Sequence, residues 1–127
     1  MRASCRLGWL RPSRLHGARP QSKTHTSWQA YCQSLERGAK GARRHVYILR
    51  TREALTCWGY MRAMQDLLVL ADENGHRIMG ACPPEQTTTL QLIRSFVRYA
   101  RAHPSELLGN AVVAVFRALG EAYPCPH

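Results

Sequence analysis

The chain has 127 residues, 45% of them hydrophobic, and a formal net charge of +10 at pH 7. This length suffices for one domain with a single modest core, and the apolar fraction is that of an ordinary globular protein. No apolar run reaches the roughly 18 residues that a transmembrane helix requires, so we expect no membrane span.

The positive charge is concentrated in the first 50 residues. Eleven of the 18 Lys and Arg residues lie there, together with one acid, Glu36. Residues 51–127 contain seven Arg and seven acids and are therefore neutral. An interaction with nucleic acid would have to rest on the N-terminal part alone.

Residues 1–26 contain six basic residues and two prolines and show no apolar periodicity, so we predict a disordered basic segment. A start codon assigned too far upstream, or an altered reading frame, would produce a similar leader. The apolar residues 7–10 are followed by Arg11 and Pro12, so no secretory signal peptide is readable. Residues 27–127 are predicted to form the helical domain.

The first predicted helix runs from Trp28 to Arg37, after a cap at Ser27. Glycines follow it, and residues 38–44 have the composition of a flexible basic linker. The next apolar residues, His45–Leu49, fit either a strand or the first turn of a helix.

Thr51 and Glu53 open a second helix that is predicted to run to about Asp72. Gly59 inside it lowers helix propensity by roughly 1 kcal/mol relative to alanine, so we expect another helix to approach closely there. Its apolar face, at steps of three and four, consists of Cys57, Tyr60 or Met61, Met64, Leu67 or Leu68, and Ala71.

Two further helices are predicted in the last 40 or so residues. The third is capped by one of Thr87, Thr88 and Thr89 and ends at His103-Pro104, because the residue before a proline avoids the helical region. Its apolar stripe is Leu90, Ile93, Val97 and Ala100, widened by Leu92 and Phe96, with Arg94, Arg98 and Arg101 opposite.

Ser105 and Glu106 open the last predicted helix, which carries two adjacent apolar rows. These rows comprise Leu108, Ala111, Val112, Val115, Phe116 and Leu119. The predicted fold class is therefore all-α, a small bundle of about four helices.

No catalytic or cofactor motif is present. The sequence lacks HExxH, GxSxG, a P-loop and GxGxxG, so we expect no enzyme activity and no cofactor. His76 lies near Cys82 in the sequence, but six histidines and five cysteines produce such neighbours by chance. Glu85 is more simply explained as an acid near a helix N-terminus.

Four cysteines, at positions 32, 57, 82 and 125, stand at helix ends or on a helix face without any CxxC pair. This pattern favours disulfides over a zinc site, and we expect no metal. Four cysteines allow three connectivities. We favour Cys82–Cys125 with Cys32–Cys57, because Cys82 and Cys125 adjoin prolines at helix boundaries, where a crosslink deforms no helix. Cys5 lies in the basic segment.

Several short motifs occur together, in an order that resembles the Rap/Tai family of immunity proteins. They are Cys57-Trp-Gly59-Tyr60 with Asp66, Cys82-Pro-Pro84-Glu85, Thr89-Leu-Gln-Leu92, Val97-Arg-Tyr99, His103-Pro104 and Glu121-Ala-Tyr-Pro124-Cys125. The resemblance covers about residues 53–126, and Trp28 to Leu35 is similar to the family's first cysteine-bearing helix.

The resemblance implies a small, helical, disulfide-bonded periplasmic protein that often forms a homodimer. Such proteins protect bacteria by occluding the catalytic cleft of a type VI secretion amidase that cleaves peptidoglycan. The long polar loop 72–86 is our candidate for the contact, through Asp72, Glu73, Asn74, His76 and Arg77, with Glu85 near its end. A loop that merely connects two helices is the alternative.

Two other functions remain open. The basic segment could bind nucleic acid or another acidic surface without specific recognition, which predicts a steep salt dependence. The chain could also be a periplasmic helical protein that has no amidase partner.

Overall fold

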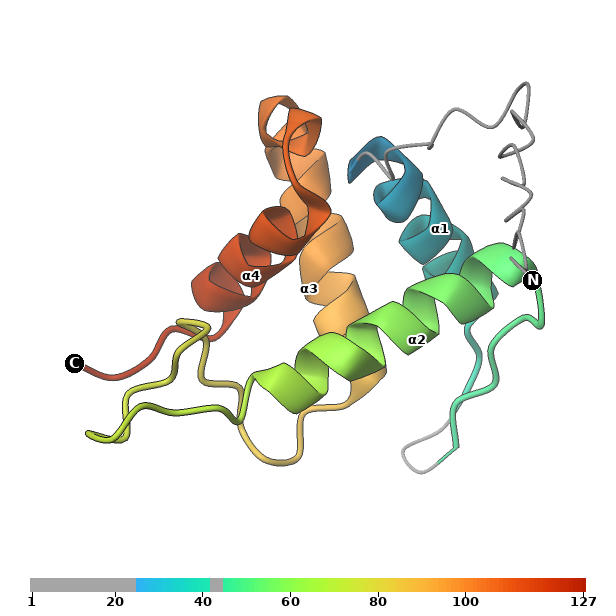
Figure 1. Cartoon of the computed structure of the whole chain (residues 1–127). Helices are drawn as coiled ribbons and strands as arrows, with labels where there is room; N and C mark the ends of the chain where they lie inside the picture. The colour runs from blue at the N-terminus through green and yellow to red at the C-terminus, as the bar shows by residue number, and fades with distance from the viewer. Residues whose placement is uncertain (1–24, 42–44) are drawn as a thin grey trace, which may run out of the picture.

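The computed structural model describes residues 25–41 and 45–127 and shows a bundle of helices (Figure 1). The elements are α1 (His25–Gly38), α2 (Arg52–Leu67), α3 (Thr89–Ala102), the 3-10 helix η1 (Pro104–Leu108) and α4 (Ala111–Ala122). Within these ranges the extended backbone forms isolated bridges and no strand, which confirms the all-α fold class. The predicted disordered segment lies outside the described residues up to position 24.

Helix α3 lies at the centre of the bundle and contacts α1, α2 and α4. Its whole apolar stripe is buried, with Leu92, Ile93, Phe96 and Val97 fully enclosed, whereas the three arginines of α3 are exposed as predicted. Thr88 caps the helix in a reciprocal arrangement with Gln91. A continuous apolar face that meets neighbours on several sides explains this central position.

Helix α2 crosses the bundle, and its buried face consists of Ala54, Cys57, Met61 and Met64, continued by Leu68 beyond the last turn. The predicted extension to Asp72 is wrong, because the chain turns at Leu68 and enters a hairpin-like loop. The amide of Ile78 donates to the carbonyl of Leu70 at 3.0 Å, which replaces helical hydrogen bonding. Ala71 is therefore exposed instead of lying on the apolar face.

Three local predictions differ from the structure. Helix α1 begins at His25, so Ser27 lies inside it and is not its cap. Gly59 is exposed, and a Cβ atom there would meet nothing within 4 Å, so no helix approaches it. Ser105 and Glu106 belong to η1, and α4 starts later, where the Asn110 side chain accepts a bond from the Val112 amide at 2.9 Å.

The ambiguous stretch His45–Leu49 is extended and not helical. Lys40 and Tyr47 exchange two backbone hydrogen bonds of 2.9 and 2.7 Å, which fold the connection between α1 and α2 back on itself. Ile48 packs against the core from this connection.

Two disulfides hold the bundle together, in the pairing that we favoured from the sequence. Cys32 of α1 is bonded to Cys57 of α2 with a Cα–Cα distance of 5.2 Å, and both residues are buried. Cys82 and Cys125 are bonded with a Cα–Cα distance of 4.9 Å and are partly exposed. The first bond joins two helices within the core, and the second joins the α2–α3 loop to the C-terminal tail.

Candidate partner-binding surface

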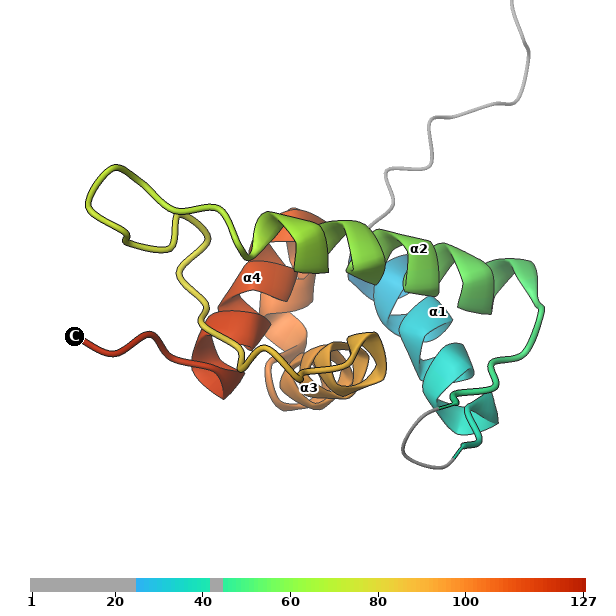
Figure 2. The same ribbon diagram turned by 90° about the horizontal axis from the view of Figure 1, so that it is seen from below.

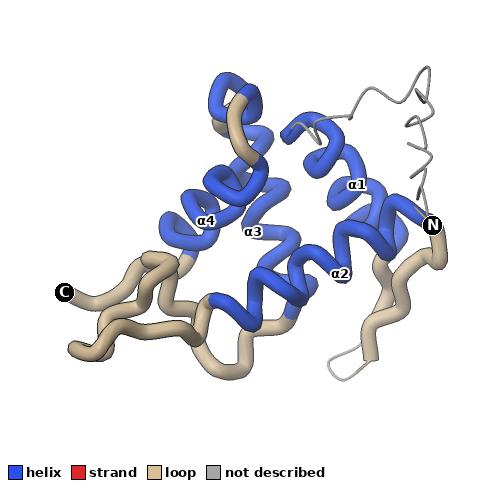
Figure 3. The backbone as a smooth tube through the Cα atoms, in the orientation of Figure 1, coloured by secondary structure: helices blue, strands red, loops and turns tan. Residues whose placement is uncertain are grey.

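The connection between α2 and α3 extends away from the helical body, on the side where the C-terminus lies (Figures 1 and 3). Every residue from Val69 to Ile78 is exposed. We call residues 69–80 the hairpin loop. Its exposure makes its side chains available to a partner without any change in the core.

Asp72 organises the tip of the hairpin loop. Its Oδ1 accepts bonds from the amides of Asn74 at 2.9 Å and His76 at 2.8 Å, and its carbonyl accepts one from Gly75 at 3.0 Å. Gly75 has a φ of +81°, a conformation that favours glycine. The hydrogen bond from the His76 amide, together with the one from the Asn74 amide, holds the pKa of the Asp72 carboxyl below its usual range, although the residue is exposed.

The stem of the hairpin loop is closed by hydrogen bonds across it. The Asp72 amide donates to the His76 carbonyl at 2.9 Å, and the guanidinium of Arg77 donates to the Val69 carbonyl. His76 Nδ1 lies 3.3 Å from Asp72 Oδ2. The loop therefore has a defined shape, and this shape depends on Asp72, His76 and Arg77, which we expected from the sequence to contact a partner.

The far end of the connection is fixed to the bundle at two places. The Cys82 amide donates to the Tyr123 carbonyl at 2.8 Å, beside the Cys82–Cys125 disulfide. The Gln65 side chain bonds the Thr87 carbonyl at 3.0 Å and the Thr89 hydroxyl at 2.7 Å. These anchors fix the loop's exit relative to the end of α2.

The candidate contact residues fall into two groups. Asp72, Glu73, Asn74, His76 and Arg77 all lie exposed on the hairpin loop. Glu85 is separate from its tip, but with Arg77 it lines a hollow of about 400 Å³ behind the stem, to which Val69, Pro83, Pro84 and Pro126 also contribute. A partner that reached into this hollow would meet both charges.

A family model describes residues 24–125 as Rap1a immunity proteins. The chain belongs to this family. Neither a curated protein nor a solved structure gives a significant match. Membership points to protection against a secreted effector, and such immunity proteins are typically not enzymes.

Several of the residues that we expected from the sequence to be family motif residues have defined structural surroundings. Tyr60 stacks on Trp28 with ring centroids 4.2 Å apart, and burial raises the pKa of its hydroxyl, which has no hydrogen-bond partner among the described residues. His103 caps α3 before Pro104, with its Nδ1 3.0 Å from the Tyr99 carbonyl. Asp66 and Pro124 are exposed.

A set of exposed aliphatic residues around the hairpin loop was not predicted from the sequence. Val69, Leu70 and Ile78 project from the loop itself, and Val112 and Val113 are exposed on α4. Ile78, Val112 and Val113 line one hollow of about 460 Å³ together with Met79, Phe116 and Arg117. The signal was the width of the apolar surface of α4, which exceeds what one packing face can bury.

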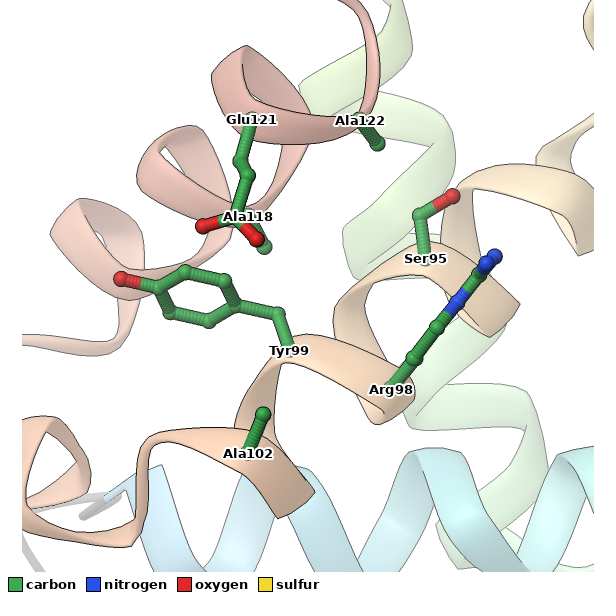
Figure 4. A pocket seen from close by; sticks show the side chains of 7 residues that line it. All are labelled: Ser95, Arg98, Tyr99, Ala102, Ala118, Glu121 and Ala122. Carbon is green, nitrogen blue, oxygen red and sulfur yellow. The ribbon is translucent and has the colours of Figure 1, made fainter.

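A third hollow, of about 350 Å³, lies between α3 and α4 and is lined by Ser95, Arg98, Tyr99, Ala102, Ala118, Glu121 and Ala122 (Figure 4). Its two charged side chains, Arg98 and Glu121, have opposite signs.

In the described ranges no three His, Cys, Asp or Glu side chains are grouped as a metal site would require. No helix there has the length and apolar character to cross a membrane.

Proposed function

We propose that this immunity protein binds a secreted peptidoglycan amidase of the type VI class and blocks its catalytic cleft with the hairpin loop. The protein acts by obstruction and performs no chemistry of its own. It works in the periplasm, where an oxidising environment maintains its two disulfides. Family membership supports the immunity role, and the amidase and the compartment are our own extension.

The projecting, internally braced hairpin loop is the observation that carries this proposal. A loop already held in one conformation loses little conformational entropy when it enters a cleft, so more of its contact energy appears as affinity. The bonds around Asp72 and the anchor at Cys82 supply this bracing. Exposed aliphatic side chains beside acidic and basic ones give the mixture that protein interfaces commonly bury.

A homodimer is a further part of the proposal. Val112 and Val113 on α4, with Ile78 on the loop, form an apolar area that a second copy could cover instead of the effector. Light scattering on the purified protein tests whether a second copy covers this area. If it does, the wild type should be a dimer and the variant with Val112→Ser and Val113→Ser should be a monomer.

The test uses purified type VI peptidoglycan amidases, with cross-linked muropeptides as substrate. We expect the wild-type protein to inhibit hydrolysis stoichiometrically. Asp72→Ala, which removes the bonds at the loop tip, should weaken inhibition about tenfold because the loop must then be ordered on binding. Its melting temperature should fall only slightly, since the lost bonds lie within the exposed loop.

Two further variants separate loop shape from contact. Glu73→Lys reverses the charge of an exposed side chain that makes no hydrogen bond or ion pair among the described residues, and it should weaken inhibition if Glu73 touches the enzyme. Glu53→Ala, an exposed acid at the opposite end of α2, should inhibit like the wild type. Absence of inhibition by the wild type would refute the proposal that the target is an amidase. Full inhibition by both loop variants would refute the proposal that the hairpin loop blocks the cleft.

A further inference from the structure

The connection between α1 and α2 lies at the end of the bundle opposite the hairpin loop (Figures 1 and 2). It exposes several large apolar side chains. Tyr47 is 73% exposed, Leu49 49% and Val46 39%. Leu55, close by in the first turns of α2, is also 49% exposed. Four such residues within ten positions are unusual on a surface that faces only water.

The exposure of these side chains is imposed by the fold. The backbone of Tyr47 is bonded in both directions to Lys40, and Ile48 is packed against the core. The side chain of Leu49 lies over Gly38, where a Cβ atom would stand only 2.4 Å from Leu49 Cδ1. The segment is thus attached to the end of α1, and its neighbouring apolar side chains project from a fixed base.

The same part of the chain is strongly cationic. The sequence contains no acid between Glu36 and Glu53. Among the described residues in this interval, Lys40, Arg50 and Arg52 are exposed and take part in no ion pair. Their charges are therefore available to an anionic partner.

We propose that Lys40, Val46, Tyr47, Leu49, Arg50 and Arg52, the cationic-apolar surface, bind the head-group region of an anionic phospholipid membrane. Tyrosine favours the membrane–water interface, where its ring meets the acyl boundary and its hydroxyl meets water. Lysine and arginine extend their charged ends toward lipid phosphates while their stems remain among apolar groups. Each cation close to an anionic membrane strengthens binding about fivefold.

A membrane explains the combination better than a soluble acidic partner does. Charge alone would suit nucleic acid or an acidic protein, but neither requires exposed aliphatic side chains between the cations. The surface is also compatible with partner binding elsewhere. Helix α2 has 16 residues, and at that length it separates the two ends of the molecule by about 24 Å. The hairpin loop would therefore stay accessible on a membrane-bound protein.

The test is co-sedimentation of the full chain with phosphatidylcholine vesicles that contain or lack phosphatidylglycerol. We expect binding to the anionic vesicles only. A variant with Val46→Ser, Tyr47→Ser and Leu49→Ser keeps every charge, so it isolates the apolar contribution from the basic N-terminal residues. Its binding should fall at least tenfold. Tyr47→Ser alone should lower binding severalfold and cannot disturb the core, because its side chain is the most exposed of the three.

A control carries Val69→Ser and Leu70→Ser, two exposed apolar residues outside both the cationic-apolar surface and the apolar area proposed for the dimer. It should bind vesicles like the wild type. Equal binding by the Val46, Tyr47 and Leu49 variant, or equal binding of the wild type to uncharged vesicles, would overturn the proposal. The proposal would also be overturned if the Val46, Tyr47 and Leu49 variant lost as much affinity for duplex DNA as for anionic vesicles. The surface would then recognise anionic polymers in general. Amidase inhibition in solution should be unaffected, so this result is independent of the proposed function.

Discussion

The Tyr99 hydroxyl links three elements through one carboxylate. It extends from α3 and donates to the Glu106 carboxylate of η1, and Arg117 of α4 lies 3.6 Å from the same carboxylate. This bond raises the pKa of Tyr99 to about 12, with burial and the negative charge of Glu106 adding to the effect. The same bond holds the pKa of Glu106 below its usual value. Tyr99 therefore joins the α3–α4 turn to the core as a hydrogen-bond donor.

Tyr99→Phe should lower the free energy of unfolding by about 1 kcal/mol at pH 7, since a part-exposed carboxylate recovers some of its solvation. The pKa of Tyr99 is higher in the folded state than the ordinary value near 10, so this stabilisation is complete below pH 10 and is lost as the pH rises toward 12. Urea unfolding of the wild type and the variant at pH 8 and at pH 11 measures the loss of stability and its dependence on pH. A difference between the two proteins that stayed constant at pH 11 would contradict this role.

Gly59 offers a prediction with the opposite sign. It lies exposed inside α2, and an added Cβ atom would meet nothing within 4 Å. Gly59→Ala should therefore stabilise the protein by about 0.5–1 kcal/mol, through helix propensity alone. Thermal unfolding would show the increase. A lower melting temperature would revive the helix contact that we expected from the sequence.

At the scale of elements, the sequence predicted the helix faces that follow from apolar periodicity. It did not predict the helix ends that are set by tertiary contacts. The stripe of α3 and the threonine cap were readable because a helix needs no distant partner to define its face. The end of α2 was not readable, because apolar residues at 67–71 continue the helical pattern. Hydrogen bonds from Asp72 and Ile78 across the hairpin loop override that pattern. The exposed valines of α4 were likewise hidden in an apolar run.

The Cys82–Cys125 disulfide joins the α2–α3 connection to the C-terminal tail. It closes a sequence separation of 43 residues, which corresponds to about 4 kcal/mol in the chain-entropy description. Replacing both cysteines by alanine should lower stability by about that amount and should also increase amide exchange around Cys82. Urea unfolding and hydrogen exchange measure the two effects.

The Cys32–Cys57 pair serves as the matched comparison. Its separation of 25 residues corresponds to about 3.5 kcal/mol. Because both sulfurs are buried, its removal should destabilise the core and leave exchange in the hairpin loop unchanged. Equal exchange in the loop for the two double variants would show that the Cys82–Cys125 bond does not control it.

At the scale of the whole molecule, part of the positive charge precedes the family match. The family match begins at residue 24, and the described helices enclose a hydrophobic core. Residues 1–23 carry six of the 18 basic residues and no acid. A function based on this segment and one based on the helical domain therefore predict different results when it is removed.

Deleting residues 1–23 should leave the melting temperature and amidase inhibition unchanged, because the core, both disulfides and the hairpin loop lie beyond the deletion. Binding to duplex DNA should weaken, and the slope of log affinity against log salt should fall by up to about 5, since each phosphate contact contributes about 0.9. Titrations at several salt concentrations measure this slope. If the deletion abolished amidase inhibition while the melting temperature held, the basic segment would be the binding element, and obstruction by the hairpin loop would be refuted. Retained inhibition with lost DNA binding would assign partner recognition to the helical domain and leave the basic charge as a non-specific property.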